Sequence, residues 1–164
     1  MSTAVLFNDD DLLMMKRSPH RTISPGLWAA VGGHLEPCEI SNPKVACLRE
    51  IYEETGMNEE NITNLNLQYI LIRQKDREIR QQFVYIGQAT TRYLPFCEEG
   101  ELHWIHRNEV FNREIPFVYK SLLLHYFQHG PTSHVWIGTI HLSEQELTKQ
   151  PQITWSPLSD PLVN

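Results

Sequence analysis

The 164-residue sequence lacks long apolar runs, a surplus of positive charge and closely spaced cysteines. Its apolar runs, such as residues 12–15, extend over only a few positions, whereas a membrane-spanning helix needs roughly 20. Asp and Glu number 20 against 14 Lys and Arg, and the resulting net charge of -6 disfavours stable binding to the phosphates of duplex nucleic acid. We therefore expect neither a membrane nor duplex nucleic acid as a partner.

The three cysteines, Cys38, Cys47 and Cys97, are too few and too widely spaced for a disulfide framework or a cysteine-based zinc site. The segment Met1–Ala4 lacks the basic and apolar regions of a secretory signal, so we expect a cytoplasmic location with reduced thiols. No repeat or Gly- and Pro-rich linker interrupts the sequence. Its length therefore predicts a single domain over residues 1–164.

Apolar runs and turn residues predict an α/β domain with a mixed sheet and two helices. The expected strands cover residues 4–8, 12–16, 27–31, 67–74, 82–89 and 102–106, and residues 134–140 are expected to form an edge strand. Helical periodicity and terminal signals predict one helix from Pro43 to Thr55, stopped by Gly56, and another from Pro116 to Gly130. The remaining tail within residues 131–164 indicates no role.

The first predicted helix carries three carboxylates on one side. At about 100° per residue, Glu50, Glu53 and Glu54 fall within an arc of roughly 100° that also contains Ala46. The expected core-facing stripe lies opposite and consists of Val45, Leu48 and Tyr52, flanked by Cys47 and Ile51. The helix is therefore amphipathic, with a concentrated acidic half.

Two interpretations of the acidic half remain open. Glu is a good helix former, so the three carboxylates fit an ordinary solvated face. A bound cation is the alternative, because the acids lie in the half of the helix where the dipole disfavours negative charge, and only Arg49 offers local relief. Mg²⁺ takes oxygen ligands and is commonly shared between carboxylates and substrate phosphates.

The segment Gly33–Glu39, followed by Arg49–Met57, resembles the Nudix box of the Nudix hydrolases. The family pattern is Gly, five residues, Glu, seven residues, then Arg-Glu-aliphatic-any-Glu-Glu-any-Gly-aliphatic, and every specified residue type is present. Nine residues instead of seven separate Glu39 from Arg49. Because Pro43 stands at the usual first helical position, the two extra residues belong to the loop near Ile40 and Ser41, which leaves the placement of Glu39 open.

The resemblance, looser outside the box, extends over residues 3–130 and implies a Nudix-type α/β/α sandwich with a mixed β-sheet. It implies metal-dependent hydrolysis of a nucleoside diphosphate linked to another group, with Mg²⁺ or Mn²⁺ as the ion. The implied catalytic residues are Arg49, Glu50, Glu53 and Glu54. The implied metal ligands are Glu50, Glu53 and Glu54, with Glu39 and, from the loop 97–101, Glu99 and Glu101 in preference to Glu98.

Four further residues are expected near the substrate. Gly33 would let its loop pass close to the metal site, and Lys16 and Arg17 would meet phosphate oxygens unless they are ordinary surface charges. Trp28 would stack on a base unless it belongs to the core.

The segment Glu101–Ile105, with Pro116-Phe117 and the following helix, resembles MutT-like, 8-oxo-dGTP-type diphosphatases. The expected reaction converts a nucleoside triphosphate, such as an oxidised purine, to the monophosphate and pyrophosphate, with a small-molecule nucleotide as the partner. ADP-ribose or a dinucleotide is the alternative substrate, although the Pro or Tyr markers expected after the box are missing. A non-catalytic nucleotide-binding sensor, an isomerase on the same fold, and the oligomeric state, a homodimer included, also stay open.

Overall fold

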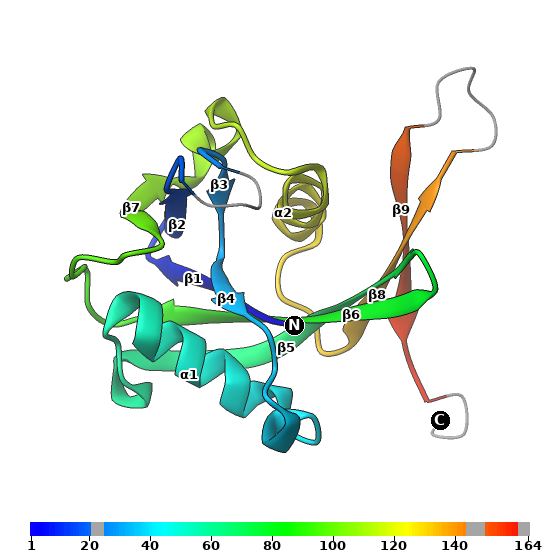
Figure 1. Cartoon of the computed structure of the whole chain (residues 1–164), viewed down its shortest axis with the longest axis horizontal. Coiled ribbons are helices and arrows are strands. Elements are labelled where there is room, and N and C mark those ends of the chain that lie inside the picture. The colour runs from blue at the N-terminus through cyan, green and yellow to red at the C-terminus, as the bar shows by residue number, and fades with distance from the viewer. Residues whose placement is uncertain (21–24, 144–149, 161–164) are drawn as a thin grey trace.

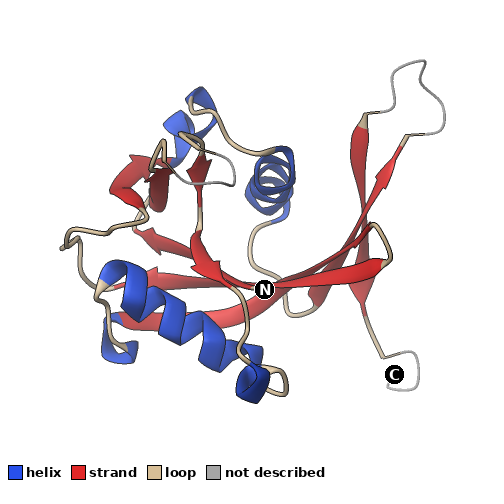
Figure 2. Cartoon of the chain, in the orientation of Figure 1, coloured by secondary structure: helices blue, strands red, loops and turns tan. Residues whose placement is uncertain are grey.

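The computed structural model describes residues 1–20, 25–143 and 150–160. Within them, nine strands form one mixed sheet, and helices α1 (Pro43–Thr55) and α2 (Phe117–His129) lie on its two faces (Figures 1 and 2). The strands are β1 (Ser2–Asn8), β2 (Asp11–Arg17), β3 (Trp28–Ala29), β4 (Val31–Gly33), β5 (Ile62–Lys75), β6 (Glu78–Ala89), β7 (Gly100–His106), β8 (Val135–Leu142) and β9 (Pro151–Leu158). Three short 3₁₀ helices are η1 (Pro37–Glu39), η2 (Glu59–Asn61) and η3 (Arg107–Asn112).

The sheet follows the order β3-β2-β1-β6-β5-β8-β9, with β4 paired to β1 and β7 paired to β2. The pairs β1–β6 and β5–β8 are parallel and the others antiparallel, so the prediction of a mixed sheet is confirmed. One side of β1 is shared, because Ser2–Ala4 pair with β4 and Phe7-Asn8 pair with β2. This arrangement places the two glycines of β4 beside the start of β1.

Alternation along β1 divides the core into two layers. Val5 and Phe7 belong to the cluster beneath α2, whereas Ala4 and Leu6 belong to the cluster beneath α1. Successive residues of a strand point to opposite faces, and a strand covered by a helix on each side is therefore apolar throughout. The α/β/α sandwich predicted from the family resemblance is confirmed.

Helix α1 begins and ends at the predicted residues. Pro43 occupies the first turn, where its missing N–H costs nothing, and Gly56 adopts a left-handed conformation while its N–H donates to the Tyr52 carbonyl at 2.8 Å. The predicted core-facing stripe is wrong for Val45 and Tyr52, which are 48% and 57% exposed, whereas Leu48 and the flanking Cys47 and Ile51 do pack in the core.

The buried arc of α1 consists of Ala46, Cys47, Ile51, Glu54 and Thr55. This arc overlaps the acidic half, because the side of the helix that carries Glu50 and Glu54 packs against Gly32 and Gly33 of β4. Hydrophobic patterning failed here because a carboxylate occupies a buried position that patterning assigns to apolar residues.

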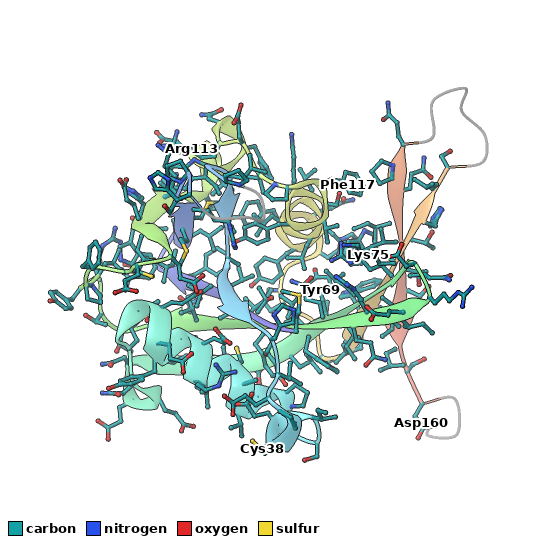
Figure 3. The ribbon with its side chains drawn as sticks, viewed as in Figure 1. Cys38, Tyr69, Lys75, Arg113, Phe117 and Asp160 are labelled. Carbon is teal, nitrogen blue, oxygen red and sulfur yellow. The ribbon has the colours of Figure 1, made fainter. Side chains whose placement is uncertain are left out.

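Helix α2 agrees with its prediction. It follows Pro116, ends at Gly130 and buries Leu122 and Leu123 against the sheet. Beneath it, the Tyr69 ring lies in the interior between the helix and β5 (Figure 3), and its hydroxyl lies 3.0 Å from His125 Nδ1. This face of the sheet is predominantly apolar and aromatic.

The C-terminal strands differ from expectation. The strand predicted at 134–140 is β8, which is not an edge strand because it lies between β5 and β9. Residues 150–158, for which the sequence indicated no role, contain β9, and Trp155 from this strand contacts Tyr69 at 5.4 Å between ring centroids. In the described part of the chain, no helix is long and apolar enough to cross a membrane.

Candidate active site

The acidic half of α1 is organised by Arg49. Its Nη1 donates to Glu50 Oε1 at 2.8 Å and to Glu53 Oε2 at 2.9 Å, and its Nη2 donates to the His34 carbonyl at 3.0 Å. A guanidinium presents several N–H donors in a fixed planar arrangement, which allows one side chain to orient several carboxylates. These carboxylates raise the pKa of Arg49 above its ordinary value, so its charge is permanent.

Glu39 joins this group despite the longer loop. Its two carboxylate oxygens accept from Arg49 Nε at 2.9 Å and Nη2 at 3.0 Å, and the Glu36 N–H donates to the same carboxylate at 2.8 Å. The hydrogen bonds from Arg49 and from the Glu36 backbone hold the pKa of the buried Glu39 below its usual value. The extra residues project outward, since Ile40 is exposed, and η1 keeps Glu39 in place.

Glu54 is the most deeply buried of the three helix carboxylates, with 6% of the residue exposed. Its Oε2 accepts a hydrogen bond from the Gly32 N–H at 3.0 Å. Burial raises the pKa of Glu54 to about 8, and the charges of Glu99 and Glu50 add to the effect against the Gly32 hydrogen bond. Burial also raises the pKa of Glu50. The site therefore concentrates negative charge that the protein compensates incompletely.

Both glycines of β4 lie in close contact with their neighbours, Gly32 with the backbone of β1 and Gly33 with the Glu50 side chain. A Cβ on Gly33 would overlap the Glu50 carboxylate, and a Cβ on Gly32 would overlap the Ser2 carbonyl of β1. Gly32 also has a φ of 144°, which side chains rarely tolerate. Gly33 thus lies against the carboxylates, where the sequence pattern predicted it.

The loop before β7 contributes one carboxylate to this group. Glu99 is half-buried, and its charge raises the pKa values of both Glu50 and Glu54. The side chain of Glu101 is 77% exposed and lies 3.4 Å from His103 Nε2. Glu98 is exposed. The structure brings Glu99, but not Glu101, toward the box.

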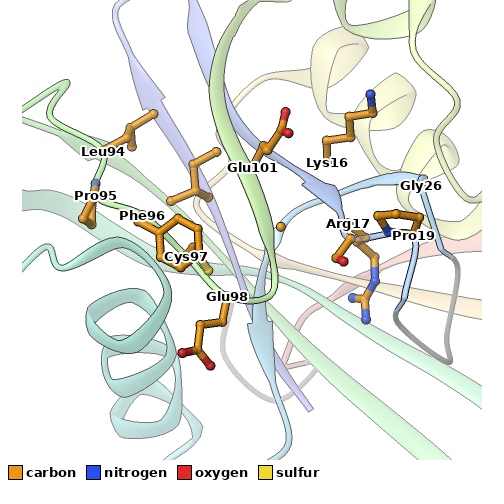
Figure 4. A pocket seen from close by; sticks show the side chains of 13 residues that line it. Lys16, Arg17, Pro19, Gly26, Leu94, Pro95, Phe96, Cys97, Glu98 and Glu101 are labelled. Atoms are coloured by element: carbon orange, nitrogen blue, oxygen red, sulfur yellow. The ribbon is translucent and has the colours of Figure 1, made fainter.

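The two predicted phosphate ligands point to opposite faces of β2. Arg17 alternates with Leu13, which belongs to the cluster beneath α1, whereas Lys16 alternates with Leu12 and Met14, which lie beneath α2. Figure 4 shows the two side chains diverging. Arg17 lies close enough to Glu54 that its charge lowers the pKa of that carboxyl. Arg17 is therefore the one of the pair that faces the carboxylates.

Trp28 packs against the core beneath α2. Its ring lies 5.2 Å from the His103 ring, and the Arg113 guanidinium lies over it at 5.4 Å. These contacts correspond to the core alternative rather than to a free stacking surface.

A divalent cation fits these residues by donor type and by charge. Glu50, Glu53, Glu54 and Glu99 offer carboxylate oxygens, and burial together with the neighbouring carboxylate charges raises the pKa values of Glu50 and Glu54, an effect that a bound cation would oppose. Within the described ranges, no three or more His, Cys, Asp or Glu side chains are already grouped to hold an ion. Arg49 instead holds Glu39, Glu50 and Glu53.

A pocket of about 770 Å³ adjoins the carboxylates (Figure 4). Its wall includes Arg17, Ser18 and the loop segment Leu94–Glu98, and Ser18 N–H donates to the Glu99 carbonyl at 3.0 Å. Sequence reasoning missed residues 94–96, because one aromatic residue in a loop does not by itself distinguish a pocket wall from an ordinary connection. The exposed aromatic Phe96 between Pro95 and Cys97 was the available signal.

The sequence matches the NUDIX domain over residues 2–126. The chain belongs to the Nudix family. This Nudix hydrolase has no match among curated protein sequences.

Solved structures share its fold. A MutT protein from Bacillus halodurans superposes with a TM-score of 0.65 at 20% identity, over 98% of this chain and 97% of that one. The NUDIX domain of Shewanella oneidensis NrtR, complexed with ADP ribose, superposes with a TM-score of 0.60 at 18% identity, over 77% of this chain and 84% of that one. An Ap4A hydrolase from C. elegans superposes with a TM-score of 0.62 at 16% identity, over 79% of this chain and 97% of that one. At identities of 20% or less, these three structures show a shared fold.

Proposed function

We propose that this Nudix hydrolase converts a nucleoside triphosphate, including an oxidised purine of the 8-oxo-dGTP type, into the monophosphate and pyrophosphate with Mg²⁺ or Mn²⁺. The arrangement that carries the proposal is the contact of Arg49 with Glu39, Glu50 and Glu53 beside a buried Glu54. The MutT-like segment at Glu101–Ile105 favours triphosphates over ADP-ribose or dinucleotides. The proposal includes a cytoplasmic location and a small-molecule nucleotide as the partner.

Each box residue has a distinct role in this proposal. Glu53 and Glu54 are metal ligands, Glu50 is a ligand or orients the attacking water, and Glu99 supplies a further carboxylate. Arg49 is a positioning residue, because its hydrogen bonds fix the directions of Glu39, Glu50 and Glu53. The Gly32 N–H holds Glu54 against β4. In this proposal, Arg17 meets phosphate oxygens of the substrate.

The reaction requires positioning and charge stabilisation rather than a covalent intermediate. Water forms a new bond to phosphorus, its proton passes to a nearby base, and the bond from phosphorus to the bridging oxygen breaks to release pyrophosphate. A bound divalent ion would neutralise the diphosphate and lower the pKa of the attacking water. The carboxylates that supply ligands belong to a rigid helix, which favours reproducible geometry.

The direct test is product analysis with a nucleotide panel. 8-oxo-dGTP, the ordinary triphosphates, ADP-ribose and a dinucleoside polyphosphate are each incubated with Mg²⁺, with Mn²⁺ and with chelator. Metal-dependent formation of monophosphate and pyrophosphate from a triphosphate supports the proposal. Preferential turnover of ADP-ribose or the dinucleotide replaces the substrate assignment, and binding without turnover supports the sensor alternative.

Glu53→Gln tests the metal-ligand assignment in the same assay. Its side chain is 53% exposed, so its loss should leave the fold intact while the rate falls about 100-fold, as expected for losing a charged ligand from a catalytic metal site. Glu60→Gln, an exposed carboxylate of η2, is the matched control. A loss smaller than about tenfold at Glu53 would contradict the assignment. Sedimentation of the same samples tests for a homodimer.

A further inference from the structure

The pocket beside the carboxylates is large enough for a nucleoside. Its volume of about 770 Å³ lies within the roughly 300–1,000 Å³ of typical ligand pockets. Apolar residues Leu94, Pro95 and Leu102 form part of its wall. Its place at the C-terminal end of α1 follows from Pro95, which approaches Gly56. The pocket therefore combines an apolar wall with a position beside the helix that carries the box carboxylates.

An aromatic ring stands at the wall of this pocket. Phe96 lines it and is 90% exposed, so one large apolar ring is held in solvent beside the cavity. Tyr93 in the same loop is 76% exposed but does not line the pocket. Flat aromatic surfaces stack on nucleobases, and such stacking contributes affinity without requiring specific hydrogen bonds.

A cation lies across the pocket from that ring. Arg17 lines the pocket, and its Nε atom is buried without a hydrogen-bond partner among the described residues. A buried donor without a partner is costly, and a ligand oxygen would satisfy it. In Figure 4, Phe96 and Arg17 lie on opposite sides of the cavity. The charge of Glu54 interacts with Arg17 and also with Cys97, and both of these residues line the pocket.

We propose that this pocket binds the nucleoside part of the substrate, with the base stacked on Phe96 and the phosphates passing Arg17 toward Glu54 and Glu99. The inference rests on the proposed function and adds to it the position of the base. The negative Glu98 lies near Phe96 and disfavours phosphates there, whereas the cations Lys16 and Arg17 line the other side of the pocket, where Glu101 faces Lys16 across the β2–β7 pair. This charge distribution favours a nucleotide whose base lies toward Phe96 and whose phosphates lie toward Arg17.

A second cavity is the rival location for the base. It has a volume of about 170 Å³, is lined by Gly32, Gln82 and Tyr119, and contains a Tyr119 hydroxyl that is buried without a partner among the described residues. Arg17 lines both cavities, so loss of Arg17 does not separate them. Phe96 and Tyr119 each belong to one cavity, and variants at these positions distinguish the two.

The test compares Phe96→Ala, Phe96→Tyr and Tyr119→Phe, with Tyr93→Ala as the matched control. The substrates are dGTP, 8-oxo-dGTP and methyl triphosphate, which carries the same phosphates without a base. Phe96→Ala is expected to raise KM for the two nucleotides about tenfold, the change produced by about 1.4 kcal/mol of stacking, with little change in kcat. KM for methyl triphosphate should not change, and Phe96→Tyr should restore the nucleotide KM.

Calorimetry with non-hydrolysable α,β-methylene-dGTP and Mg²⁺ separates this inference from the proposed reaction. Weaker binding by Phe96→Ala alone supports the pocket even if no nucleotide is hydrolysed, in which case only the reaction fails. Normal turnover with unchanged KM and Kd in Phe96→Ala overturns the pocket assignment and leaves the reaction intact. A base-dependent loss in Tyr119→Phe instead assigns the base to the smaller cavity.

Discussion

Helices α1 and α2 each contain 13 residues and cover opposite faces of one sheet, but they bury different chemistry. Helix α2 inserts Leu122 and Leu123 into an aromatic layer, and each buried leucine stabilises the fold by about 1.5–3 kcal/mol. Helix α1 inserts Glu54 beside Glu50, and a buried carboxylate destabilises the fold unless its charge is compensated. One helix therefore mainly stabilises the sheet, while the other holds reactive groups against it.

This contrast indicates that stability and activity are separated across the sheet. Carboxylates that would be solvated on an ordinary amphipathic helix are held within the protein, where Arg49 and the Gly32 N–H fix their directions. Sites of this kind are commonly less stable than the sequence permits, and neutral replacements stabilise them while removing function. The following predictions test the separation in order of expected effect.

Glu54→Gln should abolish most activity while stabilising the metal-free protein. The amide can still accept from the Gly32 N–H, but it lacks the charge required of a ligand, so we expect the rate to fall about 1000-fold. In chelator at pH 9, its melting temperature should exceed that of the wild type by about 4 °C or more. Steady-state kinetics and calorimetry measure the two effects.

The pH dependence checks the same variant. Because the folded pKa of Glu54 is about 8 and thus above its unfolded value, the folded state binds the proton more tightly. The stability contributed by the protonated Glu54 is complete below the unfolded pKa and is lost as the pH rises through about 8. The advantage of Glu54→Gln should therefore vanish near pH 4, and an equal advantage at pH 4 and 9 would contradict the burial argument.

Arg49→Lys should lower kcat about 100-fold, because a lysine ammonium cannot reproduce the planar arrangement of donors that holds three carboxylates. KM should change far less, since Arg49 positions ligands rather than substrate. Arg80→Lys, which retains an exposed ion pair with Glu78, is the control. A proportional rise in KM without a change in kcat would assign Arg49 to substrate binding instead.

Glu99→Gln should reduce kcat/KM about tenfold or more, because its charge acts on both Glu50 and Glu54. Glu101→Gln should leave kcat/KM almost unchanged, since the exposed Glu101 side chain lies beside His103. Kinetics of the two variants at saturating Mg²⁺ decide between the two candidates. Equal losses would show that the loop moves Glu101 into the site during turnover.

The face of the sheet beneath α2 should show the smallest effect, and there the stability should fall as the pH falls rather than as it rises. Burial and the neighbouring His129 lower the pKa of His125 to about 4, so its stabilising contribution is complete above the unfolded pKa near 6.5 and is lost as pH falls toward 4. His125→Gln should reduce the fall in melting temperature between pH 7 and 5 by about 2–4 °C. His141→Gln, an exposed position on β8, should not change it.

Much of this fold was predictable because local signals are strong. Pro43 and Gly56 set the ends of α1, and apolar runs between turn residues indicated the central strands. Strand β9 was missed because Pro151 and Pro157 are typical of breaks, although prolines are tolerated at a sheet edge.

The composition of the carboxylate group was predictable, but its orientation was not. Spacing along the helix identified Glu50, Glu53 and Glu54, whereas the side of α1 that is buried depends on the glycines of β4. The difference between Lys16 and Arg17 depends on strand register, and the place of Glu39 depends on the path of the loop. These features arise from contacts between distant segments, which local patterns do not encode.

The central position of β1 has a consequence for how the enzyme assembles. Its residues Ser2–Phe7 pair with Phe83–Gln88 of β6. Strand β1 therefore cannot complete its pairing until β6, about 80 residues later in the chain, has been synthesised. The β1–β2 hairpin and α1 form from neighbouring sequence, but β1 supports Gly32 and β2 receives β7. Because distant pairings form slowly, catalytic competence should be among the last properties that a newly made chain acquires.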